Sequence, residues 1–219
     1  MEISIYKQHF ILSPEKALFW KERDMLVIAD AHFSKEMHFR KNGIAVPGDI
    51  LQKDLQRLDT LIQLFQPKQL LFLGDMFHSD ANEGLSEFMG WRKRHHIMDI
   101  QLIIGNHDVL HRDWYHFADI HCVEELLITE NILWSHDRIV TENSDLINIC
   151  GHIHPYIRLL GMAKQTLRLQ CFWCAENFAI MPAFGRFTGG RVIHPSKRDK
   201  IFAAAENEII EVTERLYRN

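Results

Sequence analysis

Five short runs of apolar residues lie in the first 150 positions of the chain, and each of them ends at polar residues. They cover residues 25–29, 70–73, 100–104, 132–134 and 146–150. Apolar runs of strand length without polar alternation predict β-strands that are covered on both faces. The chain therefore has the pattern of a buried sheet whose strands all lead into polar loops.

A helix is predicted between the first two of these runs. Apolar residues recur at helical spacing from residue 49 to residue 65, with Pro47 before them and Pro67 after them. Residues 83–95 form a second predicted helix with a less regular spacing. The order strand, helix, strand, helix, strand is typical of an α/β core.

The last third of the chain has a different pattern. Short β-like stretches cover residues 166–173, 178–181, 200–204 and 209–212, and a glycine-rich turn segment covers residues 184–190. No long linker, internal repeat or low-complexity tract interrupts the sequence. We expect a second sheet that packs against the first, within a single domain that spans residues 1–219.

The composition is that of a folded globular protein, with 47% hydrophobic and 25% charged residues. The formal net charge of −4 provides no overall positive field, so general binding to duplex nucleic acid is not indicated. No apolar run reaches the roughly 18 residues that span a bilayer, and the N-terminus has no signal-peptide pattern. We expect a cytoplasmic protein that makes no membrane contact.

The four cysteines are too few and too scattered for a disulfide framework. Cys171 and Cys174 have the C-x-x-C spacing of a zinc ligand pair, but a zinc ribbon needs a second pair, and the sequence has none. Reduced thiols in the protein core are therefore favoured over a zinc site.

Candidate metal ligands occur at the end of every predicted strand of the first group. In chain order they are Asp30 and His32, Asp75 and His78, Asn106 with His107 and Asp108, His136 with Asp137, and His152 with His154. The carboxyl ends of strands in an open α/β sheet meet at one crevice, so these side chains are expected to lie together. Carboxylate, amide and imidazole ligands suit Mn²⁺, Fe²⁺ or Zn²⁺, and their number exceeds what one tetrahedral ion needs.

Taken one at a time, these residues also have purely structural explanations. Asp75 after a glycine is an ordinary turn signal, Asn106 could cap the next helix, and His136 could be a hydrogen-bonded core histidine. His152 and His154 are two positions apart on a segment that we expect to be extended, so both should point to one face. Turn chemistry alone does not explain why such residues recur at five equivalent strand ends.

In this order the motifs D-x-H, GD, GNHD, a single His and GH-x-H resemble those of the calcineurin-like metallophosphoesterases, over residues 30–154. Three further segments are similar to the bacterial DNA-ligase-associated metallophosphoesterases: HFRKNGIAVP, GDMFHS and PAFGRFTGG. The resemblance implies an α/β fold with a two-sheet β-sandwich flanked by helices. It also implies association with a DNA ligase, a helicase and a nuclease in DNA repair.

The same resemblance implies a dinuclear metal site with a defined division of ligands. One ion would be held by Asp30, His32, Asp75 and His154, and the other by Asp75, Asn106, His136 and His152. Asp75 would bridge the two ions because its carboxylate has an oxygen for each. Mn²⁺ is the first choice of metal, with Fe²⁺ and Zn²⁺ as alternatives.

The implied reaction is hydrolysis of a phosphoester by a hydroxide held between the ions. His107 occupies the position that faces the substrate and donates a proton or hydrogen bond to the leaving oxygen. Asp108 is suited to orient that imidazole and favour its protonated form. A phosphodiesterase is expected, and nucleic acid is a candidate substrate. A phosphomonoesterase or nucleotide phosphatase with the same site is the alternative, and a non-catalytic binding scaffold of the same fold is another.

Three other sets of residues have two interpretations. His78 is not assigned as a ligand, because it could support the site or line the substrate pocket. The basic residues Arg40, Lys41, Arg92, Lys93 and Arg94 could bind phosphates, although a solvated surface is favoured. The aromatic residues of the last third could stack on bases, although core packing is favoured; they are Phe172, Trp173, Phe178, Phe184 and Phe187.

Overall fold

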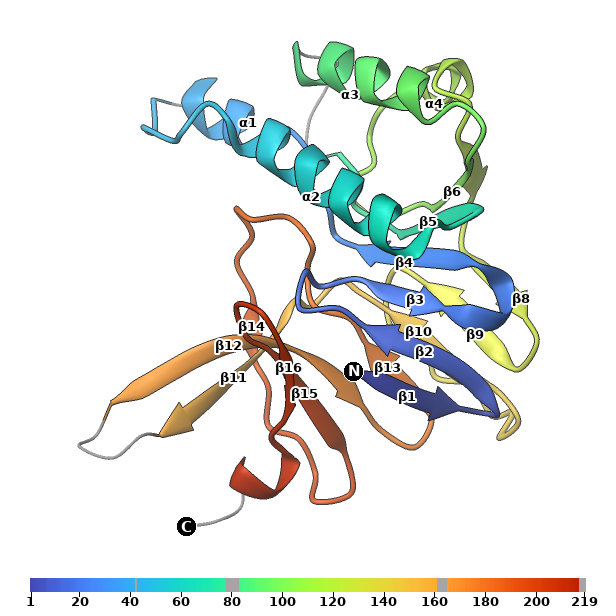
Figure 1. Ribbon diagram of the computed structural model, residues 1–219, viewed down its shortest axis with the longest axis vertical. Coiled ribbons are helices and arrows are strands. Elements are labelled where there is room, and N and C mark those ends of the chain that lie inside the picture. Colours follow the sequence, from blue (N-terminus) through green and yellow to red (C-terminus); the bar gives the residue numbers. More distant parts are fainter. Residues whose placement is uncertain (42, 78–82, 161–164, 217–219) are drawn as a thin grey trace.

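The computed structural model describes residues 1–41, 43–77, 83–160 and 165–216, and it contains two β-sheets (Figure 1). The first sheet has seven strands in the order β1-β2-β3-β4-β5-β6-β7. These are β1 (Glu2–Ile5), β2 (Gln8–Leu12), β3 (Leu18–Trp20), β4 (Met25–Ala29), β5 (Gln69–Leu73), β6 (Asp99–Ile103) and β7 (His121–Val123).

The register of the first sheet aligns the ends of its central strands. β4, β5, β6 and β7 are parallel, and Ala29 at the end of β4 pairs with Leu73 at the end of β5. Leu73 pairs in turn with Ile103 at the end of β6. The polar residues that follow these three strands therefore leave the sheet at one edge, as the sequence pattern predicted.

The second sheet has the strand order β14-β11-β12-β13-β10-β9-β8, with β15 and β16 continuing from β12. Its strands are β8 (Leu126–Thr129), β9 (Ile132–Ser135), β10 (Ile147–Cys150), β11 (Pro155–Leu160), β12 (Thr166–Cys174), β13 (Phe178–Ile180), β14 (Arg191–Val192), β15 (Lys200–Ala204) and β16 (Ile209–Glu211). β9 and β13 both pair with β10 in parallel, so their carboxyl ends again lie together.

The helices cover the outer face of the first sheet (Figure 1). They are α1 (Lys35–Lys41), α2 (Ile50–Phe65), α3 (Glu83–Arg94) and α4 (Arg112–Phe117), with the short 3-10 helices η1 (Lys21–Arg23) and η3 (Thr213–Leu216). The apolar face of α2 buries Leu51, Leu55, Leu58 and Leu61 against β4 and β5. The predicted α/β fold with two packed sheets and flanking helices is confirmed.

A second apolar core fills the space between the two sheets. It joins residues of the first sheet such as Val27 to residues of the second such as Ile149 and Phe172. The ring of Phe10 lies 5.6 Å from that of Trp20 and 6.5 Å from that of Trp134, so aromatic contacts connect the two layers. This core fixes the distance between the sheets, and with it the distance between their strand ends.

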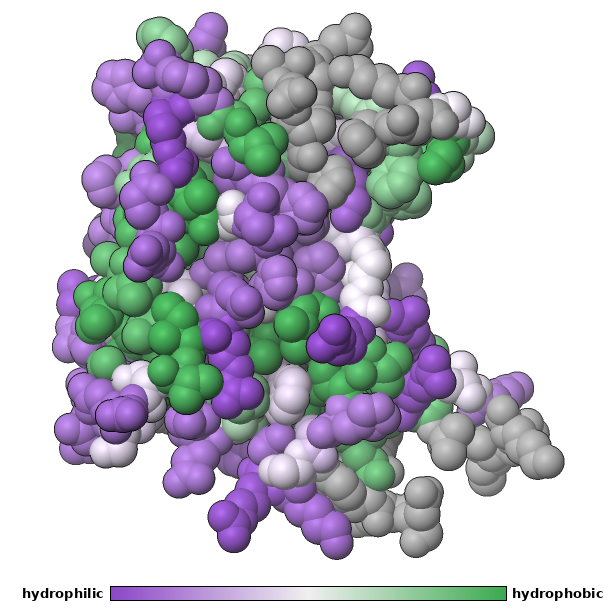
Figure 2. Space-filling model, turned by 180° about the vertical axis from the view of Figure 1, so that it is seen from behind, coloured by the Kyte–Doolittle hydropathy of each residue, from purple (hydrophilic) through white to green (hydrophobic). Residues whose placement is uncertain are grey.

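The antiparallel ribbon of β11 and β12 projects from the body of the molecule (Figure 1). From behind, the outline of the molecule is hollowed between the helical layer above and this ribbon below (Figure 2). Hydrophilic side chains gather across the middle of the same face. In the part of the chain described, no helix is both long and apolar enough to cross a membrane.

Replacement of Phe10 by alanine is expected to lower the free energy of unfolding by about 3–5 kcal/mol, because Phe10 is fully buried between the sheets. Urea denaturation at equilibrium measures this loss. Phe117→Ala is the matched control, since that phenylalanine is 76% exposed, and its effect should stay within about 0.5 kcal/mol. Similar losses for the two variants would contradict the assigned core.

Candidate metal centre

The candidate ligands from both sheets lie at one end of the sandwich. The loop after β10 reaches the loop after β4 through a hydrogen bond of 2.9 Å, from the backbone N–H of His152 to Oδ2 of Asp30. The loops after β4 and β5 are joined by the N–H of His32, which donates to the carbonyl of Asp75 at 2.8 Å. The five strand ends that the sequence singled out thus converge on one site.

Asp30, His32 and His154 form the first group of possible ligands, each offering an atom within 4.8 Å of the others. Nε2 of His154 lies 3.2 Å from Oδ1 of Asp30, and both atoms are buried without a hydrogen bond in the described structure. Nδ1 of His154 lies 3.1 Å from the carbonyl of Gly189, to which it can donate. The lone pair of Nε2 is then directed at a carboxylate oxygen, and two such atoms fit a cation between them.

Asp30, Asp75 and His136 form the second group. Nδ1 of His136 lies 3.0 Å from the carbonyl of Leu73, so a neutral imidazole donates there and keeps a lone pair on Nε2. That nitrogen lies 2.9 Å from Oδ1 of Asn106 and 3.5 Å from Oδ1 of Asp75. Nδ1 of His152 is 3.0 Å from the same nitrogen.

The donors of both groups fit divalent cations. Three kinds of lone pair, from carboxylate, amide and imidazole, are directed toward the same space, and such an arrangement is stabilised when a positive charge lies between them. The two oxygens of Asp75 face different groups, since Oδ2 lies 3.6 Å from Nε2 of His32 while Oδ1 faces His136. Asp30 also belongs to both groups, so the carboxylates of Asp30 and Asp75 are each placed to contact a cation in either group.

Charge and burial act in opposite directions on His154. Burial by itself lowers the pKa of this imidazole, but its contact with the Asp30 carboxylate outweighs burial and raises the pKa above its usual value. The charge of Asp30 thus favours a positive group at this position.

The loops that carry the ligands have an uncommon backbone conformation. Five of the candidate ligands have φ angles in the left-handed region: Asp30 at 51°, His32 at 45°, Asp75 at 49°, His152 at 69° and His154 at 47°. This conformation costs non-glycine residues about 1–2 kcal/mol each. Such a concentration of strained positions is typical of a functional site rather than of ordinary turns.

Glycines allow these loops to approach one another closely. A Cβ atom on Gly105 would lie 2.3 Å from Oδ1 of Asp75, and one on Gly151 would lie 2.4 Å from Oδ2 of Asp30. Both distances are far shorter than van der Waals contact. The glycines of the GNHD and GH-x-H motifs are therefore needed because a ligand carboxylate occupies the space of their missing side chains.

Asp108 holds the loops after β5 and β6 together. Its carboxylate accepts hydrogen bonds from the N–H groups of Gly105 at 2.8 Å, Met76 at 2.9 Å and Phe77 at 3.3 Å. Burial raises the pKa of Asp108 to about 6, although these three donors oppose the shift. The structure thus gives Asp108 a loop-positioning role, while its predicted effect on the His107 imidazole stays a prediction.

His107 is half-buried beside the two groups. Its N–H donates to Oδ1 of Asp75 at 2.9 Å, and its ring centroid lies 5.5 Å from that of His32. This places the imidazole at the margin of the site, where a bound substrate can reach it. Its role in proton transfer stays a prediction.

Two expectations from the sequence are wrong. His152 and His154 do not lie on an extended segment, because β10 ends at Cys150 and both histidines have left-handed φ angles. They face one region because the loop turns, not because a strand alternates. Arg92 is not on a solvated helix face, since it is buried and donates to the carbonyl of Ala118 and the carboxylate of Asp119.

Further expectations concerned the aromatic residues of the last third of the chain, two cysteines and His78. Phe172, Phe178 and Phe184 are buried, which confirms core packing, whereas Phe187 is 38% exposed. Cys171 and Cys174 are free thiols, the first buried and the second half-buried. Burial raises the pKa of both, that of Cys174 to about 12, so neither is a reactive thiolate. His78 lies outside the described residues.

Lys35 is a residue of the site that the sequence analysis did not assign. It follows the first motif and begins α1, close enough to Asp75 and Asp30 for their charges to act on its ammonium group. Burial lowers the pKa of Lys35, and the two carboxylates oppose that shift. A half-buried cation beside the ligand carboxylates can bind an oxygen of a phosphate. The only sequence signal was its position five residues after Asp30.

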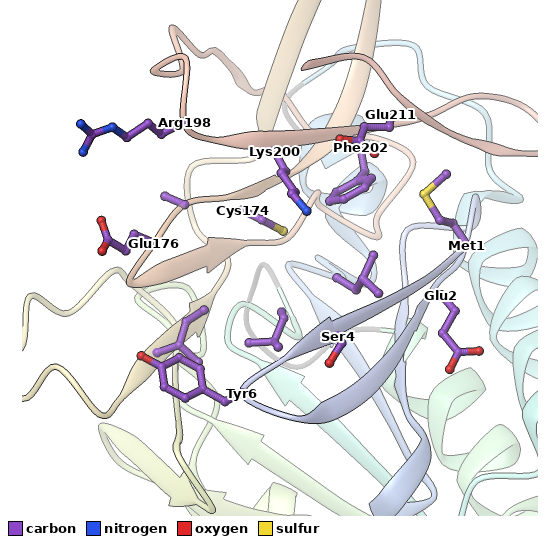
Figure 3. A pocket seen from close by; sticks show the side chains of 14 residues that line it. Met1, Glu2, Ser4, Tyr6, Cys174, Glu176, Arg198, Lys200, Phe202 and Glu211 are labelled. Carbon is purple, nitrogen blue, oxygen red and sulfur yellow. The ribbon is translucent and has the colours of Figure 1, made fainter. Parts of the chain in front are cut away.

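A cavity of about 730 Å³ lies elsewhere, between β1 and the strands β12 and β15 (Figure 3). Its lining includes the apolar residues Ile3 and Phe202 and the charged residues Glu176, Arg198 and Lys200. It shares no residue with the two ligand groups. The candidate chemistry is therefore at the strand ends and not in this cavity.

Comparison with known proteins gives a structural similarity that covers almost the whole chain. The crystal structure of the nuclease MPE from Pseudomonas putida matches with a TM-score of 0.79 and 29% sequence identity, covering 96% of this chain and 98% of that one. A phosphoesterase of E. coli, YfcE, matches with a TM-score of 0.48 and 14% identity over 85% of this chain and 96% of that one. No family model and no curated protein matches the sequence. The resemblance predicted from the motifs is confirmed.

Gly105→Ala is expected to disrupt the centre, because its Cβ atom would collide with the carboxylate and the backbone nitrogen of Asp75. We expect a loss of about 1–3 kcal/mol in the free energy of unfolding and weaker metal binding, measured by denaturation and by titration with Mn²⁺. Gly90→Ala is the matched control. A Cβ atom there meets no atom within 4 Å, so this helical position should gain about 0.5–1 kcal/mol.

His154→Ala and His152→Ala are expected to remove different ions, because His154 contacts Asp30 whereas His152 contacts His136. Each variant, loaded with Mn²⁺ and desalted, should keep one of the two ions, as measured by elemental analysis. His96→Ala, which changes an exposed histidine, should keep both. Loss of both ions, or of neither, in the two test variants would contradict the division.

Proposed function

We propose that this chain, which has the calcineurin-like metallophosphoesterase fold, is a hydrolase that uses two divalent metal ions to cleave phosphodiester bonds. The observation that carries the proposal is the convergence of the buried side chains of Asp30, Asp75 and His136 at the aligned strand ends. The similarity to a nuclease over nearly the whole length of both chains favours a diester of nucleic acid as the substrate.

The two groups of side chains indicate which residues would hold each ion. Asp30, His32 and His154 would hold one ion, and His136, His152 and Asn106 the other, with Asp75 between them. When bound, the ions supply positive charge for the phosphate oxygens and lower the pKa of a coordinated water. Mn²⁺ is the proposed ion because the donors are mixed nitrogen and oxygen atoms.

The remaining roles belong to side chains at the margin of the centre. His107 is held through its backbone by Asp75, so its imidazole can donate a proton to the leaving oxygen without itself being a ligand. Lys35 supplies a positive charge that can bind a nonbridging phosphate oxygen. Asp108 keeps the loop of His107 in place through three backbone hydrogen bonds.

The proposed cellular context comes from the sequence. A role in DNA repair beside a DNA ligase, a helicase and a nuclease follows from the motif resemblance, and the cytoplasmic location follows from the sequence pattern of the N-terminus and the cysteines. The single-domain organisation over residues 1–219 is supported by the apolar core that the two sheets share.

Activity is expected to depend on metal and to prefer diesters. Protein stripped with a chelator should be inactive, and Mn²⁺ should restore hydrolysis of single-stranded DNA and of a small aryl phosphodiester. A faster rate on an aryl phosphomonoester would favour the alternative, a phosphomonoesterase. Failure on all substrates with Mn²⁺, Fe²⁺ and Zn²⁺ would favour a binding scaffold.

His107→Ala should lower kcat by about 10²–10⁴-fold, the usual contribution of a general acid, while the metal content stays at that of the unaltered protein. Asp75→Asn should lose both activity and bound metal, because it removes charge from both groups. His96→Ala is the control for histidine replacement. Full activity in His107→Ala would contradict its role.

A further inference from the structure

A second candidate site lies on the other side of the loop 182–190. It is a cavity of about 650 Å³, here called the basic cavity, and its charged lining includes Lys16, Arg57, Arg168 and Arg186 together with Glu15 and Glu206. It shares no residue with the ligand groups of the metal centre.

The loop 182–190 is a common wall of the basic cavity and the metal centre. The carbonyl of Gly189 faces Nδ1 of His154 at 3.1 Å, and the carbonyl of Gly190 accepts a hydrogen bond of 2.8 Å from Arg168. Earlier in the loop, the N–H of Gly185 donates to the carbonyl of Asp30 at 3.2 Å. Adjacent residues of one loop thus contact a candidate metal ligand and a cation of the cavity.

The carboxylates around the cavity pair with only some of its cations. Arg57 pairs with Glu15 at 2.6 Å and with the buried Asp54 at 2.8 Å, and Arg186 shares Asp54 at 3.5 Å. Of the ion pairs found among the described residues, none involves Lys16 or Arg168. These two cations are therefore available to an external anion.

The guanidinium of Arg168 is oriented by its neighbours. Its guanidinium lies 4.0 Å from the centre of the Tyr156 ring, which fixes the plane of its donors. It also stands directly opposite Arg158 in the register of β11 and β12. Two like charges at facing positions of an antiparallel pair destabilise it, and a bound anion would relieve that repulsion.

Lys16 is the second cation of the cavity that lies outside the ion pairs of the described residues. It has a left-handed φ angle of 63°, in the turn between β2 and β3. Burial and the neighbouring Arg57 lower the pKa of its ammonium group to about 8, against the opposing effect of Asp54 and Glu15. A bound anion would offset the cost of burying this ammonium ion.

We propose that the basic cavity binds a backbone phosphate of a nucleic-acid strand whose scissile phosphate lies in the metal centre. The inference rests on the proposed function for its choice of substrate. Lys16 and Arg168 would contact the phosphate oxygens through charge-assisted hydrogen bonds, and Arg186 at the loop surface would add to the field. The cavity would then make polynucleotides better substrates than small diesters.

The test compares single-stranded DNA with a small aryl phosphodiester, and it measures both kinetics and binding. Arg168→Gln and Lys16→Gln each remove one positive charge and should raise KM for single-stranded DNA by about tenfold. The rate on a small aryl phosphodiester, which cannot reach the cavity, should not change. Arg23→Gln is the matched control, because Arg23 also lies over an aromatic ring, that of Trp20, but precedes β4 at the opposite end from the metal centre.

Binding is measured separately, with the metal removed by a chelator so that no cleavage occurs. A labelled DNA strand of about 12 nucleotides is titrated at several salt concentrations. Each test variant should reduce the slope of log K against log salt by about 0.7, the value for one lost phosphate contact on a single strand, while Arg23→Gln keeps the full slope. Thermal unfolding confirms that all variants are folded.

Two outcomes would separate the two proposals. If the unaltered protein hydrolyses neither substrate, the proposed function is wrong, and the salt slopes still decide whether the cavity binds phosphate. If Arg168→Gln and Lys16→Gln both keep the full slope and the unaltered KM, the cations are neutralised by Glu15, Asp54 and Glu206, and the inference is overturned.

Discussion

The carboxylate of Asp30 is the group on which the arrangement of the site depends. It is fully buried, it accepts a hydrogen bond from the backbone of His152, and it faces both His154 and His136. Asp30 directly follows β4 of the first sheet, and its carboxylate joins that strand end to the loop after β10 in the second sheet. A buried carboxylate is stabilised only when hydrogen bonds or positive charges surround it. The two sheets therefore meet at a buried carboxylate that a cation would stabilise.

The loops around the Asp30 carboxylate have a strained backbone. Left-handed φ angles at Asp30, His32, Asp75 and two histidines of the second sheet cost several kcal/mol together, and burial of like-charged carboxylates adds to that cost. Bound cations would offset both costs, because each would be held by lone pairs that otherwise repel one another. The core between the sheets, with Phe10 and Trp134 at its centre, holds the loops in this conformation before any ligand binds.

Much of this fold could be predicted because its strands are continuous apolar runs. β4 has the predicted bounds, and β5, β6 and β10 differ from prediction by a residue at one end or at both. α1 and α4 were not predicted, since helices of six or seven residues give no clear periodicity. The ligand residues were found from their order along the chain, whereas their left-handed backbone, the roles of Lys35 and Asp108 and the burial of Arg92 depend on long-range packing that local sequence patterns do not contain.

The loop 182–190 shows how one segment can serve two purposes. Its first half is tied to the strand ends, because the N–H of Phe184 donates to the carbonyl of Ala29 and Arg57 donates to the carbonyl of Phe184. Its last two glycines orient His154 on one side and Arg168 on the other. A displacement of this backbone would therefore change the metal ligand and the cavity cation together. In a protein that cleaves a polymer, such a shared wall keeps a constant distance between the phosphate that is cleaved and the phosphate that is only bound, and distance along the strand is what distinguishes a polynucleotide from a small diester.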